Sequence, residues 1–293
     1  MLDGLWAVVL AAGAGRRLAS LTGGIPKQFW RLDGGPTLLE VTLSRLEPLA
    51  PPGRTVIVVD QAHARYVAMP QPGQIRFQPS DRGTAAGVLF GLLPILALAP
   101  DAPVVMTPSD HGVTDARVFR AGIRHAAAQI GRRSDVIVFG VQPDYAAEDY
   151  GWITPDVGRP GRLRDVTAFV EKPPASLARR LHGDGALWNT MVIVARASSL
   201  LELHRRHVPE VARVFERALG LPPTIRDGWL RDAYEDLPVH DFSRDVLTPA
   251  ADLLAYTWPP SLGWSDLGTP ERLRRWLGRS RHLSHSSTSP SAA

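Results

Sequence analysis

The sequence predicts a doubly wound α/β domain, and three observations predict it. Short runs of β-branched and apolar residues alternate with stretches of helical pattern, which is typical of strands and helices that build one sheet. Several of these runs are continuously apolar, as in a buried, mainly parallel sheet. Hydrophobic residues make up 44% of the 293 residues, which is enough for a core. The pattern changes after residue 150, and we expect a mixed, mainly parallel central sheet.

The first half of the chain carries the clearest alternation. Strands are expected at Leu5–Ala11, Thr55–Asp60, Pro103–Thr107 and Asp135–Val141. Helices are expected from Pro36 to about Pro48, at Thr84–Leu98 and at Asp115–Ile130. A glycine-rich turn follows the first of these strands. This order predicts strands that alternate with helices packed on the sheet.

The second half is expected to add strands at Arg164–Glu171 and Ala186–Ala195. Its helices are expected near Ala175–Leu181, Arg196–His207 and Pro209–Leu219. Residues 278–293 are rich in serine, lack an apolar pattern and are expected to form a disordered tail. We therefore predict one domain over residues 1–277, without internal repeats.

Composition excludes several classes of function. The chain has no cysteine, so it has no disulfide, no thiol nucleophile and no cysteine-ligated zinc. The longest apolar run, Val88–Ala99, is shorter than the ~20 residues that a membrane span needs. The formal net charge is only +4, which gives no reason to expect a nucleic-acid partner. We expect a cytoplasmic protein that binds neither nucleic acid nor membrane.

The lysines are scarce and therefore informative. Of the 33 basic residues only Lys27 and Lys172 are lysine, and the others are arginine. A lysine in such a background indicates a place where a compact ammonium is needed and a planar guanidinium is unsuitable. The alternative is that both lysines remain by chance.

A glycine-rich loop follows the first expected strand. Its residues are Ala11, Ala12, Gly13, Gly15, Arg16 and Arg17, and Lys27 follows in the segment Pro26–Phe29. Glycine lets backbone N–H groups approach phosphates at the carboxyl edge of a sheet, and the three cations suit a triphosphate. The sequence matches neither the dehydrogenase fingerprint nor the P-loop. The alternative is an ordinary glycine turn.

Two acids are candidate metal ligands. Asp110 follows the expected strand Pro103–Thr107, and Asp266 lies between glycines in Gly263–Gly268. If the fold brings them together, two carboxylates completed by phosphate oxygens and water are the ligands that Mg²⁺ favours. Taken alone, Asp110 is more often a helix cap or a turn residue.

Three further residues are candidate ligands for a substrate. Glu171 and Lys172 end an expected strand before a proline, and Asn189 follows Trp188 near the start of another. The alternatives are an exposed ion pair and a core position filled by Trp188. His204 and His207 have no partner in the pattern and are expected to be solvated. Ser109 has no nucleophile-elbow motif, so no catalytic triad is assigned.

Taken together, seven segments resemble the bacterial mannose-1-phosphate guanylyltransferases, within the sugar-1-phosphate nucleotidyltransferase family. They occur in the family's order from about Leu5 to Leu277. The matching segments are LAAGAGRRLASLTGGIPKQF at Leu10–Phe29, QPSDRGTAAG at Gln78–Gly87, PSDH at Pro108–His111, YGWI at Tyr150–Ile153, FVEKP at Phe169–Pro173, LWNT at Leu187–Thr190 and GWSDLG at Gly263–Gly268.

The resemblance implies a Rossmann-like nucleotidyltransferase fold and a role for each matching residue. GTP and a hexose 1-phosphate, mannose 1-phosphate in this branch, would be the substrates, and Mg²⁺ or another divalent cation the cofactor. The implied catalytic residues are Arg17, Lys27 and Lys172. The implied nucleotide-binding residues are Ala11, Ala12, Gly13, Gly15, Arg16, Arg17, Lys27, Arg82, Gly83 and Thr84. The implied sugar-phosphate ligands are Gly151, Glu171, Lys172 and Asn189, and the implied metal ligands are Asp110 and Asp266.

The chain departs from the family pattern at three places. It has Gly83 where an asparagine is usual before the threonine, a shortened segment before Tyr150, and Met191 where a glycine is usual. These positions would line the base and sugar pockets, so a glucose-1-phosphate uridylyl- or thymidylyltransferase stays an alternative. Another is a catalytically silent regulatory protein on the same fold, and a sugar-alcohol-phosphate cytidylyltransferase fits less well. The C-terminal β-helix of longer relatives is expected to be absent, and a homodimer is left open.

Overall fold

The computed structural model describes the chain except for residues 1–3, 69–70, 132–135, 157, 159–160 and 287–293. Within the described residues, nine strands form one sheet in the order β3-β2-β1-β4-β8-β5-β9-β7-β6. The strands are β1 (Trp6–Ala11), β2 (Thr55–Asp60), β3 (Gln74–Gln78), β4 (Pro103–Pro108), β5 (Val136–Val141), β6 (Gly151–Pro155), β7 (Leu163–Glu171), β8 (Leu187–Arg196) and β9 (Leu253–Thr257). The expected mixed α/β sheet is confirmed.

The two halves of the sheet differ in strand direction. Strands β3, β2, β1 and β4 are parallel neighbours. Strand β8 then inserts antiparallel between β4 and β5, and β7 pairs antiparallel with β9 and β6. Of the nine pairings between described strands, four are parallel and five antiparallel. In its pairings the sheet is therefore mixed but not mainly parallel as expected, because β8 and β7 run antiparallel to their neighbours and the parallel pairings are concentrated in the first half.

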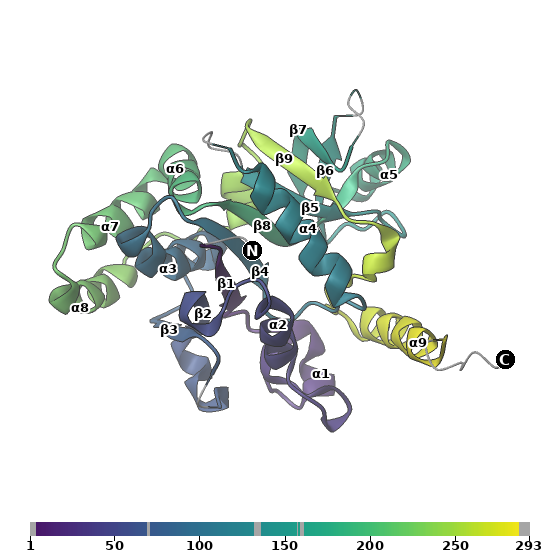
Figure 1. Cartoon of the computed structure of the whole chain (residues 1–293), viewed down its shortest axis with the longest axis horizontal. Coiled ribbons are helices and arrows are strands. Elements are labelled where there is room, and N and C mark those ends of the chain that lie inside the picture. Colours follow the sequence, from purple (N-terminus) through teal and green to yellow (C-terminus); the bar gives the residue numbers. More distant parts are fainter. Residues whose placement is uncertain (1–3, 69–70, 132–135, 157, 159–160, 287–293) are drawn as a thin grey trace.

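Helices cover both faces, as a doubly wound domain requires. The longer helices are α2 (Leu38–Leu46), α3 (Gly83–Leu98), α4 (Ala116–Gln129), α5 (Ala175–Gly183), α6 (Ala197–His207), α7 (Pro209–Leu219), α8 (Pro223–Tyr234) and α9 (Pro270–Ser286), and α1 (Ala19–Thr22) is a single turn. Figure 1 shows α6, α7 and α8 grouped at the left of the molecule and α9 at the lower right.

Side-chain alternation along the strands produces two cores. In β1, Val8 packs in the cluster that includes α3, α6 and α7, whereas Ala7 and Val9 pack in the cluster that includes α2 and α4. Successive strand residues point to opposite faces, so a strand buried on both faces is apolar throughout. A small third cluster, Leu38, Leu267 and Leu273, joins α9 to α2.

The expected strands and helices are confirmed with boundaries shifted by one to a few residues. The first expected helix begins later than Pro36 because Thr37 forms a capping box with Glu40. Among the described strands and α-helices, six were not expected: β3, β6, β9, α1, α8 and α9.

The expectation of a disordered tail from Gly278 is wrong for its first part. Helix α9 continues to Ser286, and Arg279 on this helix forms an ion pair with Asp144 at 2.9 Å. This ion pair joins α9 to the segment that follows β5. The other residues of that segment, 287–293, lie outside the described part of the chain.

Candidate active site

The loop after β1 is held by a segment that follows it in sequence. Gly15 adopts a positive φ of 60°, and a Cβ there would lie 2.9 Å from the backbone nitrogen of Lys27. The buried Gln28 side chain donates from Nε2 to the carbonyl oxygens of Ala11 and Gly13, at 2.7 and 3.0 Å. The glycine therefore permits a close approach that a larger residue would block. The side chain of Arg16 lies outside the described ones.

Lys27 joins the two candidate metal ligands. Its Nζ atom lies 3.2 Å from Oδ2 of Asp110 and donates to the backbone oxygen of Asp266. The residue is only 5% exposed. Gly112 and Ser265 exchange two backbone hydrogen bonds, at 2.8 and 3.0 Å, so the segments that carry the two acids run side by side. The structure thus brings together residues that are far apart in sequence.

The Asp266 carboxylate is surrounded by donors. The Tyr150 hydroxyl donates to Oδ1 at 2.7 Å, as does the backbone N–H of Gly268 at 3.0 Å, and Arg272 donates from Nη1 to Oδ2 at 3.1 Å. Burial alone would raise the pKa of Asp266, but these donors hold it below its ordinary value. Burial and the neighbouring Asp266 raise the pKa of Tyr150, so the phenol keeps the proton that it donates.

Sequence reasoning missed Tyr150 and Arg272 as parts of this site. Arg272 also donates to Asp149 at 2.5 Å and to the Tyr145 hydroxyl at 3.0 Å, and its guanidinium lies 4.2 Å from the Tyr150 ring centroid. The only available signal was position, because Tyr150 stands inside YGWI and Arg272 six residues after Asp266. A contact of this kind depends on the fold, so neither position alone would have revealed it.

Arg17 lies at the rim of the same cluster. Its guanidinium is 3.0 Å from Asp149 and 3.9 Å from Asp266, and its side chain is 60% exposed. It therefore combines acidic partners with access to solvent. A charged side chain in this position can exchange a carboxylate for a phosphate at little cost, since exposed ion pairs are weak.

Asp110 and Asp266 fit a divalent cation shared with a substrate. Lys27 forms an ion pair with the Asp110 carboxylate and donates to the backbone oxygen of Asp266. The pKa of Asp110, which burial would raise, is held below its ordinary value by Lys27 and His111. Mg²⁺ commonly uses one or two carboxylates and takes its other oxygens from phosphate and water. Among the described residues no group of three or more His, Cys, Asp or Glu side chains could hold a metal. The donor set therefore suits an ion completed by substrate oxygens.

Two buried residues, Thr42 and Arg45, hold the backbone on either side of Asp110 in place. Thr42 donates to the backbone oxygen of Ser109 at 3.0 Å, and Arg45 donates to Thr42 at 2.9 Å and to the His111 oxygen at 3.4 Å. Burial lowers the pKa of Arg45 to about 10 and that of His111 to about 4. His111 is therefore neutral at pH 7.

The candidate sugar-phosphate ligands form a second cluster. Gly151 pairs with Glu171 in the sheet, and a Cβ at Gly151 would lie 2.5 Å from Oε2 of Glu171 and 3.3 Å from Cβ of Asn189. Lys172 is 3.0 Å from Oε1 of Glu171 and its side chain is 59% exposed. Burial raises the pKa of Glu171. Four residues near the ends of three strands thus lie close together: Gly151, Glu171, Lys172 and Asn189. They surround a space that a side chain at position 151 would fill.

The backbone of this cluster is unusual at two positions. Lys172 has a φ of 47° and Met191 a φ of 57°, both in the left-handed region. A methionine in this conformation costs energy that a glycine would not. Asn189 accepts a hydrogen bond from the Met191 N–H at 3.1 Å and is thereby fixed.

The expected base-facing segment lies at the start of α3. Arg82 is 3.2 Å from Glu235, and the Thr84 hydroxyl accepts a hydrogen bond from the Phe242 N–H at 2.7 Å. Gly83 has a φ of 79°, and a Cβ there would clash with the His240 carbonyl. These contacts pack the segment against residues 240–242. Its role toward a base stays a prediction.

The expectation that His204 is solvated is wrong. Its side chain is fully buried, and its Nδ1 and Nε2 atoms lie 2.7 and 3.2 Å from the carbonyl oxygens of Leu200 and Ala85. Burial lowers the pKa of His204 to about 4. The histidine therefore belongs to the interface between α6 and α3.

Comparison with known proteins shows the family to which this chain belongs. A family model described as nucleotidyl transferase matches residues 6–277. The chain belongs to that family. This nucleotidyl transferase is 30% identical over 273 residues to the xanthan biosynthesis protein XanB of Xanthomonas campestris pv. campestris, covering 89% of the chain. It is 28% identical over 286 residues to mannose-1-phosphate guanylyltransferase of Escherichia coli, covering 90%.

A solved structure is similar to this chain over most of the length of both. It is described as a mannose-1-phosphate geranyltransferase from Thermus thermophilus, with a TM-score of 0.81 and 31% identity, covering 94% of this chain and 79% of that one. By contrast, the nucleotidyl transferase spans 57% of the Xanthomonas protein and 58% of the Escherichia coli protein. Within its described residues we find no helix long and apolar enough to cross a membrane.

Proposed function

We propose that this nucleotidyl transferase joins GMP, taken from GTP, to mannose 1-phosphate. An oxygen of the sugar phosphate forms a new bond to the α-phosphorus of GTP. The bond from that phosphorus to the bridging oxygen of the β-phosphate breaks, and pyrophosphate leaves with the electron pair. The products are GDP-mannose and pyrophosphate.

One observation carries this proposal: Tyr150 connects the two clusters of candidate ligands. Its hydroxyl donates to Asp266, its backbone oxygen accepts from the Lys172 N–H at 3.1 Å, and the next residue is Gly151. The cluster of Lys27, Asp110 and Asp266 therefore adjoins the cluster around Glu171. A reaction between two phosphorylated substrates needs such adjoining sites.

The chemistry asks for positioning and charge neutralisation. The nucleophile needs no strong base, because a phosphate monoester has its second pKa near ~6 and is mostly a dianion at neutral pH. The two substrates repel each other, so cations that hold both must supply much of the rate enhancement. We assign this role to Lys172 on the sugar phosphate and to Arg17 on the nucleotide.

The acids and Lys27 complete the assignment. A divalent cation such as Mg²⁺ held by Asp110 and Asp266 would neutralise phosphate charge at that point. Lys27 keeps the two acids together, and Tyr150 and Arg272 orient the Asp266 carboxylate. Glu171 and Asn189 offer a carboxylate and an amide that can hydrogen-bond sugar hydroxyls.

The choice of mannose is supported by two relatives whose names carry mannose 1-phosphate, and the choice of guanine by one of them, a guanylyltransferase. The test is pyrophosphate release over a matrix of four nucleoside triphosphates and several hexose 1-phosphates, with and without Mg²⁺. We expect GTP with mannose 1-phosphate and Mg²⁺ to be the most active combination. Preference for UTP or dTTP with glucose 1-phosphate would contradict the substrates but not the reaction. No turnover with any pair would contradict the reaction itself.

A further inference from the structure

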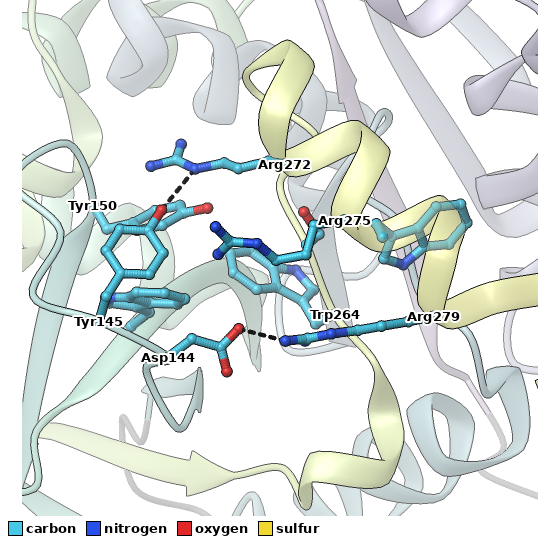
Figure 2. A pocket seen from close by; sticks show the side chains of 10 residues that line it. Asp144, Tyr145, Tyr150, Trp264, Arg272, Arg275 and Arg279 are labelled. Atoms are coloured by element: carbon cyan, nitrogen blue, oxygen red, sulfur yellow. Dashed lines mark hydrogen bonds and ion pairs between the residues drawn. The ribbon is translucent and has the colours of Figure 1, made fainter. Parts of the chain in front are cut away.

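A pocket lies beside α9 (Figure 2). Trp188, which lines it, and Asn189 are consecutive in β8 and point to opposite faces, so the pocket lies on the face of the sheet opposite the sugar-phosphate ligands. Trp188 packs in the core cluster of Tyr150 and Trp152. The empty space is about 350 Å³, its open mouth included. A second hollow of about 620 Å³, its open mouth included, adjoins it and shares Asp144, Trp188, Trp264 and Arg279. We name the two together the α9 pocket.

Two buried indole N–H groups in this pocket have no hydrogen-bond partner among the residues that the structure describes. The Nε1 atoms of Trp188 and Trp264 are buried without a hydrogen bond among the described residues, and Trp188 is only 6% exposed. The neighbouring Trp152 and Trp276 are different, because their Nε1 atoms donate to backbone oxygens at 2.9 Å. A buried donor without an acceptor is costly. A ligand with acceptor oxygens would satisfy both.

The mouth of the pocket is cationic. Figure 2 shows Arg275 and Arg279 reaching from α9 toward the side that carries Tyr145 and Asp144. Arg275 pairs with Glu271 at 2.9 Å and Arg279 with Asp144 at 2.9 Å, and these acids are 75% and 46% exposed. Such exposed pairs contribute little to stability. A phosphate group can therefore replace the carboxylates, since guanidinium binds it through paired hydrogen bonds.

The walls between these groups are aromatic. The Trp188 ring lies 4.9 Å from that of Tyr145 and 4.6 Å from that of Tyr150, and Tyr150 lies 5.7 Å from Trp264. Rings of this size offer flat apolar surface against which a sugar or base can pack. We propose that the α9 pocket binds a small phosphate monoester whose remaining part carries acceptor oxygens and a flat apolar face, the class to which hexose phosphates belong.

Occupancy of the α9 pocket bears on the active site through two residues. Tyr150 and Arg272 line the pocket and donate to the two oxygens of Asp266. A ligand packed against them competes for these two donors and so disturbs the orientation that they give the Asp266 carboxylate. The bound monoester is therefore an inhibitor; this consequence rests on the proposed function, whereas binding does not.

Binding can be measured without turnover. The probe is glucose 6-phosphate, which carries no phosphate on C1 and cannot act as the acceptor in the proposed reaction. We expect a saturable change in tryptophan fluorescence, weakened at least about tenfold in the double variant Arg275→Gln/Arg279→Gln. Arg274→Gln is the matched control, because this exposed arginine of the same helix does not line the pocket. It should bind like the wild type.

Two more variants separate this pocket from the active site. Trp188→Phe keeps an aromatic ring and removes the unpartnered N–H, so it should weaken binding several-fold. Lys172→Ala should bind the probe unchanged. Equal affinity in the double variant, loss of binding in Lys172→Ala, no saturable change in the wild type, or equal affinity for inorganic phosphate or for glucose would each overturn the proposal.

Inhibition is tested separately. Glucose 6-phosphate should lower pyrophosphate release by the wild type and leave release by the double variant unaffected. Binding without inhibition would overturn the link through Tyr150 and Arg272. If no substrate pair gave turnover, the proposed function would fail while the fluorescence titration still decided whether the site exists.

Discussion

The two lysines of the chain occupy opposite environments. The Lys27 side chain is 6% exposed and forms an ion pair with Asp110, whereas the Lys172 side chain is 59% exposed beside Glu171. A buried ion pair that loses one partner leaves an uncompensated charge, but an exposed one is replaced by water. The same substitution should therefore have different effects on stability at the two positions.

Lys27→Ala is expected to lower the free energy of unfolding by about 3 kcal/mol, because it strands the Asp110 carboxylate in a partly buried place. Lys172→Ala should change it by less than about 0.5 kcal/mol. On the proposed function, each should reduce turnover about 100-fold, the loss of one charge-assisted contact to a phosphate. Urea denaturation and pyrophosphate release measure the two effects.

Lys27→Arg is the control that separates charge from shape. A guanidinium keeps the charge but is wider than the space around a 5% exposed residue. We expect it to restore little activity. Wild-type activity in Lys27→Arg would show that only the charge matters there.

Gly151 leaves space for a candidate sugar ligand. In Gly151→Ala the new Cβ would lie 2.5 Å from Oε2 of Glu171, so that carboxylate must move. Gly151 has no positive φ, so the backbone tolerates alanine. We expect a higher KM for the hexose 1-phosphate with a smaller change in kcat. Gly228→Ala, where a Cβ meets nothing within 4 Å, is the matched control and should leave both unchanged.

At the scale of elements, α6 packs on α3 through a histidine. The ordinary pKa of 6.5 falls to about 4 in His204 because the ring is fully buried between Leu200 and Ala85. Between these pH values the unfolded chain binds a proton that the folded chain does not. Stability is therefore fully present above pH 6.5 and decreases as the pH falls toward 4.

The predicted size of this effect is about 2 kcal/mol lost between pH 7 and pH 5. His204→Gln supplies an amide that can donate to a carbonyl and does not titrate. The unfolding free energy of His204→Gln should vary less with pH than that of the wild type. The difference in slope should correspond to about one proton bound on unfolding. Denaturant titrations over this range measure the difference. Parallel pH curves for the two proteins would contradict the buried, neutral histidine.

Four of the missed elements, β3, β6, β9 and α8, share a weak local signal. Strand β3 (QIRFQ) is a sheet edge with polar residues, and β6 and β9 contain only five residues each. Helix α8 contains Gly228 and buries few residues. Their place in the structure depends on neighbours, since β9 lies between β5 and β7. His204 could have been predicted as buried, because Leu200, Leu203 and His204 lie on one helical face.

At the scale of the whole molecule, the site is assembled from distant parts of the chain. Asp110 and Asp266 could be predicted because Asp110 follows an expected strand in PSDH and Asp266 lies between glycines in GWSDLG. Tyr150, Asp149 and Arg272 could not, because a hydrogen bond between side chains more than 100 residues apart leaves no local pattern. The motifs therefore predicted the charged groups, and only the fold revealed what orients them.

This assembly makes the last helix part of the site. Arg272 donates to Asp266 and Asp149, and Leu273 packs with Leu38 and Leu267. A chain ended after Thr269 loses these contacts and leaves the Asp266 carboxylate without its guanidinium. We expect it to unfold at lower temperature and, on the proposed function, to lose most of its turnover.

A chain ended after Arg279 is the matched control. It keeps Arg272, Leu273 and the ion pair between Arg279 and Asp144. Because it keeps the α9 contacts that the structure describes, this variant should match the full chain in thermal unfolding and turnover. Differential scanning fluorimetry and pyrophosphate release compare the three chains. Full activity after truncation at Thr269 would show that the Asp266 carboxylate does not need α9.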